Sequence, residues 1–123
     1  DIVAGNHGEN SRFRGSEQKP VRMYAGDFDN NGSVEQVLTV YNGAKAYPMA
    51  LRHDLVGVLP NLKKKYLKYE NYKEQTIEDI FSAEQLSKAV KLEAKELRSS
   101  VLLNNRGGKF IMKALPGLKR SIP

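Results

Sequence analysis

Hydrophobic and polar positions follow two different patterns along the chain, and each pattern predicts its own kind of element. In residues 1–48, and again from residue 101, short runs of β-branched, aromatic and aliphatic side chains lie between segments rich in Gly and Asn. This arrangement is typical of strands joined by tight turns. The strands it predicts are residues 2–4, 21–24, 36–41, 46–47, 101–103 and 110–112. Asn42-Gly43 predicts a two-residue hairpin turn, because both central positions of a type I′ turn need positive φ.

Residues 50–98 are rich in Leu, Lys and Glu at helical spacing, so about three helices are expected there. The first covers residues 55–59, with Asp54 as its N-cap and Pro60 as its end. In the second, Leu62, Tyr66 and Tyr69 share one face, which is expected to pack inward while the neighbouring lysines stay in solvent.

The third helix has the clearest start signal. Ser82 and Gln85 have the spacing of a capping box, in which each side chain accepts a hydrogen bond from the other residue's backbone N–H. Apolar residues then recur at helical spacing as far as Leu97, which predicts a helix over residues 83–97. Thr76 with Asp79 offers a similar cap for a short turn over residues 77–81.

Together these elements predict an α+β fold, in which a short antiparallel sheet is interrupted by a helical insertion. The expected parts are a β region with the turn-rich loops (1–48), the helical insertion (49–99), and a returning hairpin with a basic tail (100–123). Asp1-Ile2-Val3 resembles Glu35-Gln36-Val37, and residues 101–110 form a third strand–turn–strand unit. We therefore expect a fragment of a longer repeat protein.

Composition narrows the class of protein. The chain has 123 residues, 40% of them hydrophobic, which is enough to fold around a modest core. It has no cysteine, which excludes disulfides, thiolate metal sites and cysteine nucleophiles. No apolar run approaches the roughly 18 residues that a transmembrane helix needs. The net charge is +6, and the residues from 106 onward contain no acid. The basic residues of that tail are Arg106, Lys109, Lys113, Lys119 and Arg120.

One loop carries recognisable chemistry. Oxygen-bearing side chains occupy positions 1, 3, 5 and 9 of a nine-residue segment that has a glycine at position 6. These side chains are Asp27, Asp29, Asn31 and Glu35. Calcium takes six to eight oxygen ligands at about 2.3–2.6 Å, and alternate residues of a tight loop can point at one ion. Without a cation the three carboxylates repel one another, so ion binding and loop order are expected to be coupled.

The other residues of the loop extend the prediction. Gly32 permits the sharp turn, Ser33 can offer its backbone carbonyl, and Val34 is expected to anchor the loop to the core. The loop is not an EF-hand, because position 12, which needs a bidentate Glu, is Leu38. The alternative is a hairpin turn made of the ordinary turn formers Asp, Asn and Gly. The predicted ion is Ca²⁺, and its predicted ligands are Asp27, Asp29, Asn31, Ser33 and Glu35.

Asp1-Ile2-Val3-Ala4-Gly5-Asn6 and the segment from Asp27 to Glu35 resemble FG-GAP or VCBS repeats of integrin-like β-propellers. More narrowly, most of the chain resembles the ASPIC/UnbV-containing repeat proteins of the bacterial cell envelope, in which a helical stretch interrupts the blades. Asn31 and Glu35 depart from the family pattern, which usually has Asp at both positions. The resemblance implies sheets of the propeller-blade type, calcium in inter-strand loops and export to the cell envelope or beyond. It also implies a non-catalytic binding or adhesive role.

Two other functions are weighed against this one. A basic, aromatic-interleaved surface formed by Lys63, Lys64, Lys65 and Lys68, with the basic tail, would bind polyanions or nucleic acid. An enzymatic function ranks third among the candidates, because the two histidines are separated and no Gly-x-Ser-x-Gly or His-Glu-x-x-His motif is present. The expected partner is therefore a protein or glycan rather than nucleic acid. Open sheet edges also make a homo-oligomer an expected assembly.

Overall fold

A computed structural model describes residues 1–117, which form two antiparallel sheets and three short α-helices. The α+β fold class predicted from the hydrophobic pattern is therefore confirmed. Lys119 and Arg120 of the predicted basic tail lie outside the described residues.

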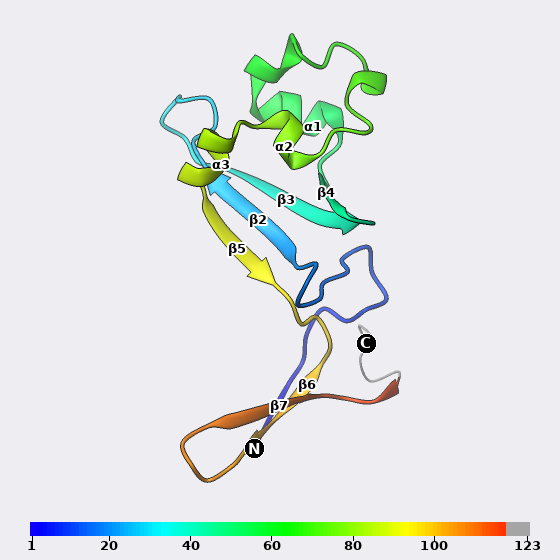
Figure 1. Cartoon of the computed structure of the whole chain (residues 1–123), viewed down its shortest axis with the longest axis vertical. Helices are drawn as coiled ribbons and strands as arrows, with labels where there is room; N and C mark the ends of the chain where they lie inside the picture. Colours follow the sequence, from blue (N-terminus) through cyan, green and yellow to red (C-terminus); the bar gives the residue numbers. More distant parts are fainter. Residues whose placement is uncertain (118–123) are drawn as a thin grey trace.

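The elements follow one another from strands to helices and back to strands (Figure 1). The strands are β1 (Ile2–Ala4), β2 (Val21–Gly26), β3 (Glu35–Asn42), β4 (Lys45–Pro48), β5 (Val90–Ala94), β6 (Ser100–Asn104) and β7 (Phe110–Ala114). The helices are α1 (Arg52–Val58), α2 (Ile77–Ile80) and α3 (Ala83–Lys88), with 3₁₀ turns η1 (Pro60–Lys63) and η2 (Tyr69–Asn71).

The larger sheet has the strand order β4-β3-β2-β5 and supports the helical insertion. Tyr24 of β2 lies opposite Val37 of β3, and both are buried on the face that meets the insertion. Aromatic and aliphatic side chains from the 3₁₀ turns and helices complete this core. Its buried members are Tyr24, Phe28, Val37, Leu55, Leu59, Leu62, Tyr66, Tyr72, Ile77, Ile80 and Phe81.

The smaller sheet has the order β1-β6-β7 and lies at the opposite end of the molecule from the helices (Figure 1). β1 therefore pairs with a strand about a hundred residues later in the chain. The linking segments also contact each other, because the Gly8 N–H donates to the Leu97 carbonyl (2.6 Å) and the Asn6 N–H donates to the Ser99 hydroxyl (3.2 Å).

The prediction of a long third helix over residues 83–97 is wrong in its second half. The capping box of Ser82 and Gln85 forms as predicted, but α3 ends at Lys88 and β5 begins at Val90. β5 pairs with β2 along its whole length. The apolar positions Val90 and Leu92 fit the alternation of a strand as well as the spacing of a helix. Pairing with β2 favours the strand.

The second helix is also replaced, in this case by two 3₁₀ turns. Leu62 and Tyr66 are buried as expected, but Tyr69 is 58% exposed, so the three do not share an inward face. α1 begins after Leu51, which has no side-chain cap, and Asp54 lies in its first turn rather than at the N-cap. Thr76 and Asp79 form the predicted capping box at the start of α2.

The β3–β4 hairpin turn is displaced by one residue from its predicted place. Asn42 pairs with Lys45, so the two central residues are Gly43 and Ala44. Only Gly43 has positive φ (65°), which is the requirement of a type II′ turn rather than type I′.

Candidate metal centre

The candidate site lies in the loop between β2 and β3. β2 ends at Gly26, β3 begins at Glu35, and these two residues are antiparallel partners. The register therefore brings the two ends of the loop together, and with them the side chains of Asp27 and Glu35.

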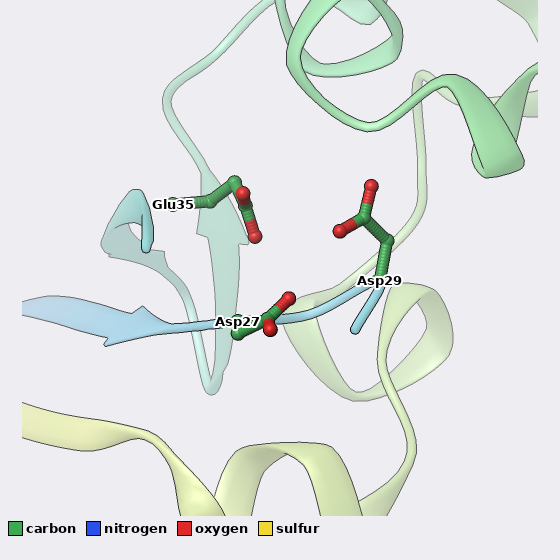
Figure 2. Close-up of side chains that lie close together, drawn as sticks. All are labelled: Asp27, Asp29 and Glu35. Atoms are coloured by element: carbon green, nitrogen blue, oxygen red, sulfur yellow. The ribbon is translucent and has the colours of Figure 1, made fainter. Parts of the chain in front are cut away.

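Three carboxylates converge in this loop. One oxygen from each of Asp27, Asp29 and Glu35 lies within 4.8 Å of the other two. Figure 2 shows the three groups turned toward a common space beside the start of β3. Ligands on opposite sides of a calcium ion at about 2.3–2.6 Å are about 4.6–5.2 Å apart, so this spacing suits a single ion. The cluster can hold a metal ion.

Backbone N–H groups hold Asp27 in place. Its Oδ1 accepts a hydrogen bond from Asn31 N (3.0 Å) and its Oδ2 accepts one from Gly32 N (2.9 Å). The chain can turn this tightly because Asn30 and Gly32 both have positive φ (58° and 87°). The Gly32 N–H, followed by that of Asn31, lowers the pKa of Asp27 below its usual range. The ionised form, which is the one that binds metal, is therefore favoured.

Asn31 orients the next carboxylate. Its amide Nδ2 donates to Asp29 Oδ2 (3.1 Å), and its Oδ1 accepts from Ser33 N (2.7 Å). Asp29 Oδ1 also accepts from Asn31 N (3.2 Å). The structure thus brings together the three carboxylates of the predicted ligand set, whereas Asn31 and Ser33 remain predictions as ligands.

Glu35 is the buried member of the cluster, with 5% of its surface exposed. Its Oε2 accepts a hydrogen bond from the Phe28 N–H (3.0 Å). This backbone hydrogen bond gives the buried carboxylate one of the partners that offset the cost of its burial. A cation held by the three carboxylates would give Glu35 a further partner.

Phe28, rather than Val34, anchors the loop. Val34 is exposed, which corrects the prediction, while Phe28 is buried and packs on the Phe81 ring (4.3 Å between centroids). Gln85 of α3 adds a second contact, because its Nε2 donates to the Phe28 carbonyl (2.8 Å). Spacing along the chain identified Gln85 only as part of a helix cap. Its bond to the loop depends on where α3 packs.

The β6–β7 loop provides an internal comparison. There Arg106 and Gly108 have positive φ (60° and 74°), with the same separation as Asn30 and Gly32. Asn105 Oδ1 accepts from Gly107 N (2.9 Å), as Asp29 accepts from Asn31 N. An amide side chain therefore supports this kind of turn without any charge. The turn alone does not explain the carboxylates of the β2–β3 loop.

Asp1 corresponds to Glu35 in the similarity between Asp1-Ile2-Val3 and Glu35-Gln36-Val37. Its Oδ1 accepts a hydrogen bond from the Asn104 N–H (2.7 Å), which ties β1 to the end of β6. Asp1 therefore supports the hairpin of the smaller sheet.

The basic run at residues 63–68 lies in irregular chain and 3₁₀ turns rather than along a helix. The side chains of Lys63, Lys64 and Lys68 are exposed, and Lys65 donates to the Asp79 carbonyl through its Nζ. Between them, Leu67 is 71% exposed. Tyr69, the residue after Lys68, is also exposed, so an aromatic ring is accessible next to the lysines in the sequence.

Comparison of the chain with family models, curated proteins and solved structures found no match. Among the described residues, no helix is long and apolar enough to cross a bilayer.

Proposed function

We propose that this chain is a calcium-stabilised, non-catalytic binding module of an exported bacterial protein, as the resemblance to FG-GAP and VCBS repeats implies. The observation that supports it best is the approach of three carboxylate oxygens to within 4.8 Å of one another. Carboxylates this close repel one another unless a cation lies between them. Hard oxygen ligands in an adaptable loop suit calcium better than the smaller magnesium ion, which demands near-ideal octahedral geometry.

Calcium binding is expected to order the loop and raise the stability of the whole fold. Phe28 carries the coupling, because its N–H bonds Glu35 while its ring lies in the hydrophobic core. For a dissociation constant of about 10⁻⁴–10⁻³ M, about 10 mM calcium stabilises the fold by about 1.4–2.7 kcal/mol. The gain corresponds to a rise of several degrees in Tm.

The test is thermal unfolding of the full chain in calcium, in magnesium and in chelator. Asp29→Asn should abolish the calcium-dependent rise in Tm, whereas Glu74→Gln, which removes an exposed charge outside the cluster, should keep it. Magnesium at the same concentration should give a smaller rise. The proposal fails if calcium leaves Tm unchanged, or if Asp29→Asn responds as strongly as the parent chain.

Glu35→Gln provides a second test, because the variant is expected to change Tm in opposite directions in chelator and in calcium. The glutamine carbonyl can still accept the Phe28 N–H, but one of the mutually repelling charges is gone. In chelator the variant should therefore unfold at a higher temperature than the parent. In calcium the order should reverse.

Polyanion binding is the second candidate, because Leu67 and Tyr69 are exposed beside Lys63, Lys64 and Lys68. Basic groups with an accessible aromatic ring suit phosphate and base contacts. This function requires retention on heparin or DNA that weakens steeply with salt. Replacing the three exposed lysines with alanine should remove that retention, and unchanged retention would exclude this surface.

A further inference from the structure

The smaller sheet is apolar on both faces, and both faces are exposed. The register places Ile2, Leu102 and Met112 in one row and Val3, Val101 and Lys113 in the next, on the opposite face. The large apolar side chains of this sheet that are more than half exposed are Ile2, Val3, Phe110, Ile111 and Met112. A three-stranded sheet with two uncovered apolar faces is typical of a surface that another chain covers.

Both edges of this sheet are free among the described residues, because β1 and β7 are the outer strands in the order β1-β6-β7. β7 is the longer of these two edge strands. It extends over five residues, Phe110–Ala114, and lies far from the helical insertion (Figure 1). An exposed edge strand of this length presents a row of backbone donors and acceptors to an incoming strand.

Charge indicates which strand fits this edge. From Leu97 to Gly117 the chain has no Asp or Glu, while it has Arg106, Lys109 and Lys113 in or beside the hairpin. None of these three forms a salt bridge within the described part of the chain. Two copies pairing through this edge would bring like charges together, whereas acidic side chains opposite the lysines are favourable.

We propose that the free edge of β7 binds an extended acidic segment of a partner protein, which adds to the smaller sheet as a fourth strand. Backbone hydrogen bonds to β7 supply the pairing, and the apolar faces supply sites for alternate side chains. The proposal does not depend on the calcium loop. The row of Leu38, half-buried Met23 and Leu92 on the larger sheet is apolar too, but it carries no charge that would specify an occupant.

The probe is a capped synthetic heptapeptide in which Glu and Val alternate, titrated into the isotope-labelled full chain at up to about 1 mM. Binding should shift the amide resonances of residues 110–114 and slow their hydrogen exchange. A peptide of the same sequence with N-methylated alternate backbone amides keeps the charge but cannot pair as a strand, so it should not bind. A peptide with Lys in place of Glu should not bind either.

Variants test the charge argument. Lys109→Glu with Lys113→Glu should weaken binding of the acidic peptide about tenfold, because two attractive cross-strand pairs become repulsive. Lys73→Glu makes the same kind of change at an exposed lysine near the helices and should leave affinity unchanged within about twofold. Equal binding of the N-methylated peptide would show simple polyanion attraction and overturn strand addition. Absence of binding by the acidic peptide, or protection of another strand instead of β7, would also overturn the proposal.

Discussion

A single residue, Phe28, connects the candidate site to the hydrophobic core. Phe28 does so through three groups: its N–H bonds Glu35, its carbonyl accepts from Gln85, and its ring packs on Phe81. A change in the position of Phe28 would therefore affect the loop, α3 and the core together. This explains why an ion held by the carboxylates of this loop is expected to change the stability of the whole fold.

Tyr72 shows the opposite electrostatic behaviour from Asp27. It is buried, and its hydroxyl donates to the Ala50 carbonyl (2.6 Å). Burial, followed by the nearby Tyr66, raises the pKa of Tyr72 to about 12. Because the folded pKa lies above the unfolded value of about 10, this contribution to stability is complete below pH 10. It is lost as the pH rises through the folded pKa.

We expect Tyr72→Phe to lower the free energy of unfolding by about 1 kcal/mol near neutral pH, since one hydrogen bond is lost. Between about pH 10 and 12 the variant should lose stability less steeply than the parent, because it has no hydroxyl to ionise at this position. Urea unfolding at a series of pH values measures both effects. Tyr47→Phe is the control, because Tyr47 is half-buried and is not among the groups that raise the pKa of Tyr72.

At the scale of elements, close backbone approach decides where glycine is required. A Cβ added at Gly15 would lie 2.7 Å from the carbonyl oxygen of Ala94, at the end of β5. The backbone at Gly15 therefore runs close against the end of β5. Gly57 lies in α1, and a Cβ there would meet nothing within 4 Å.

Gly→Ala substitution should therefore have opposite effects at these two positions. Gly15→Ala should cost about 1–3 kcal/mol, because the clash is with backbone that cannot rotate away. Gly57→Ala should stabilise the fold by about 0.5–1 kcal/mol, because helical backbone favours Ala over Gly and the added Cβ meets nothing. Urea midpoints measured at constant m-value give both changes. Equal effects would contradict the close approach of residue 15 to β5.

At the scale of the whole molecule, the carboxylate loop and the basic hairpin lie far apart. The carboxylate loop lies at the end of the larger sheet nearest α3, whereas the basic hairpin β6–β7 projects from the other end (Figure 1). The metal centre and the β7 edge share no residue, so substitutions at one are expected to be additive with those at the other. The two proposals can therefore be tested in the same chain without interference.

Features that depend on a few neighbouring residues were determined by the sequence itself. The capping boxes at Thr76 and Ser82, the six strands predicted and the carboxylates of the loop belong to this group. Only the tertiary structure decided that residues 90–94 form a strand, because there they pair with β2 instead of continuing α3. It also decided that Phe28 rather than Val34 enters the core, and that Gln85 reaches the loop. These outcomes depend on contacts between residues far apart in the chain, which local spacing does not encode.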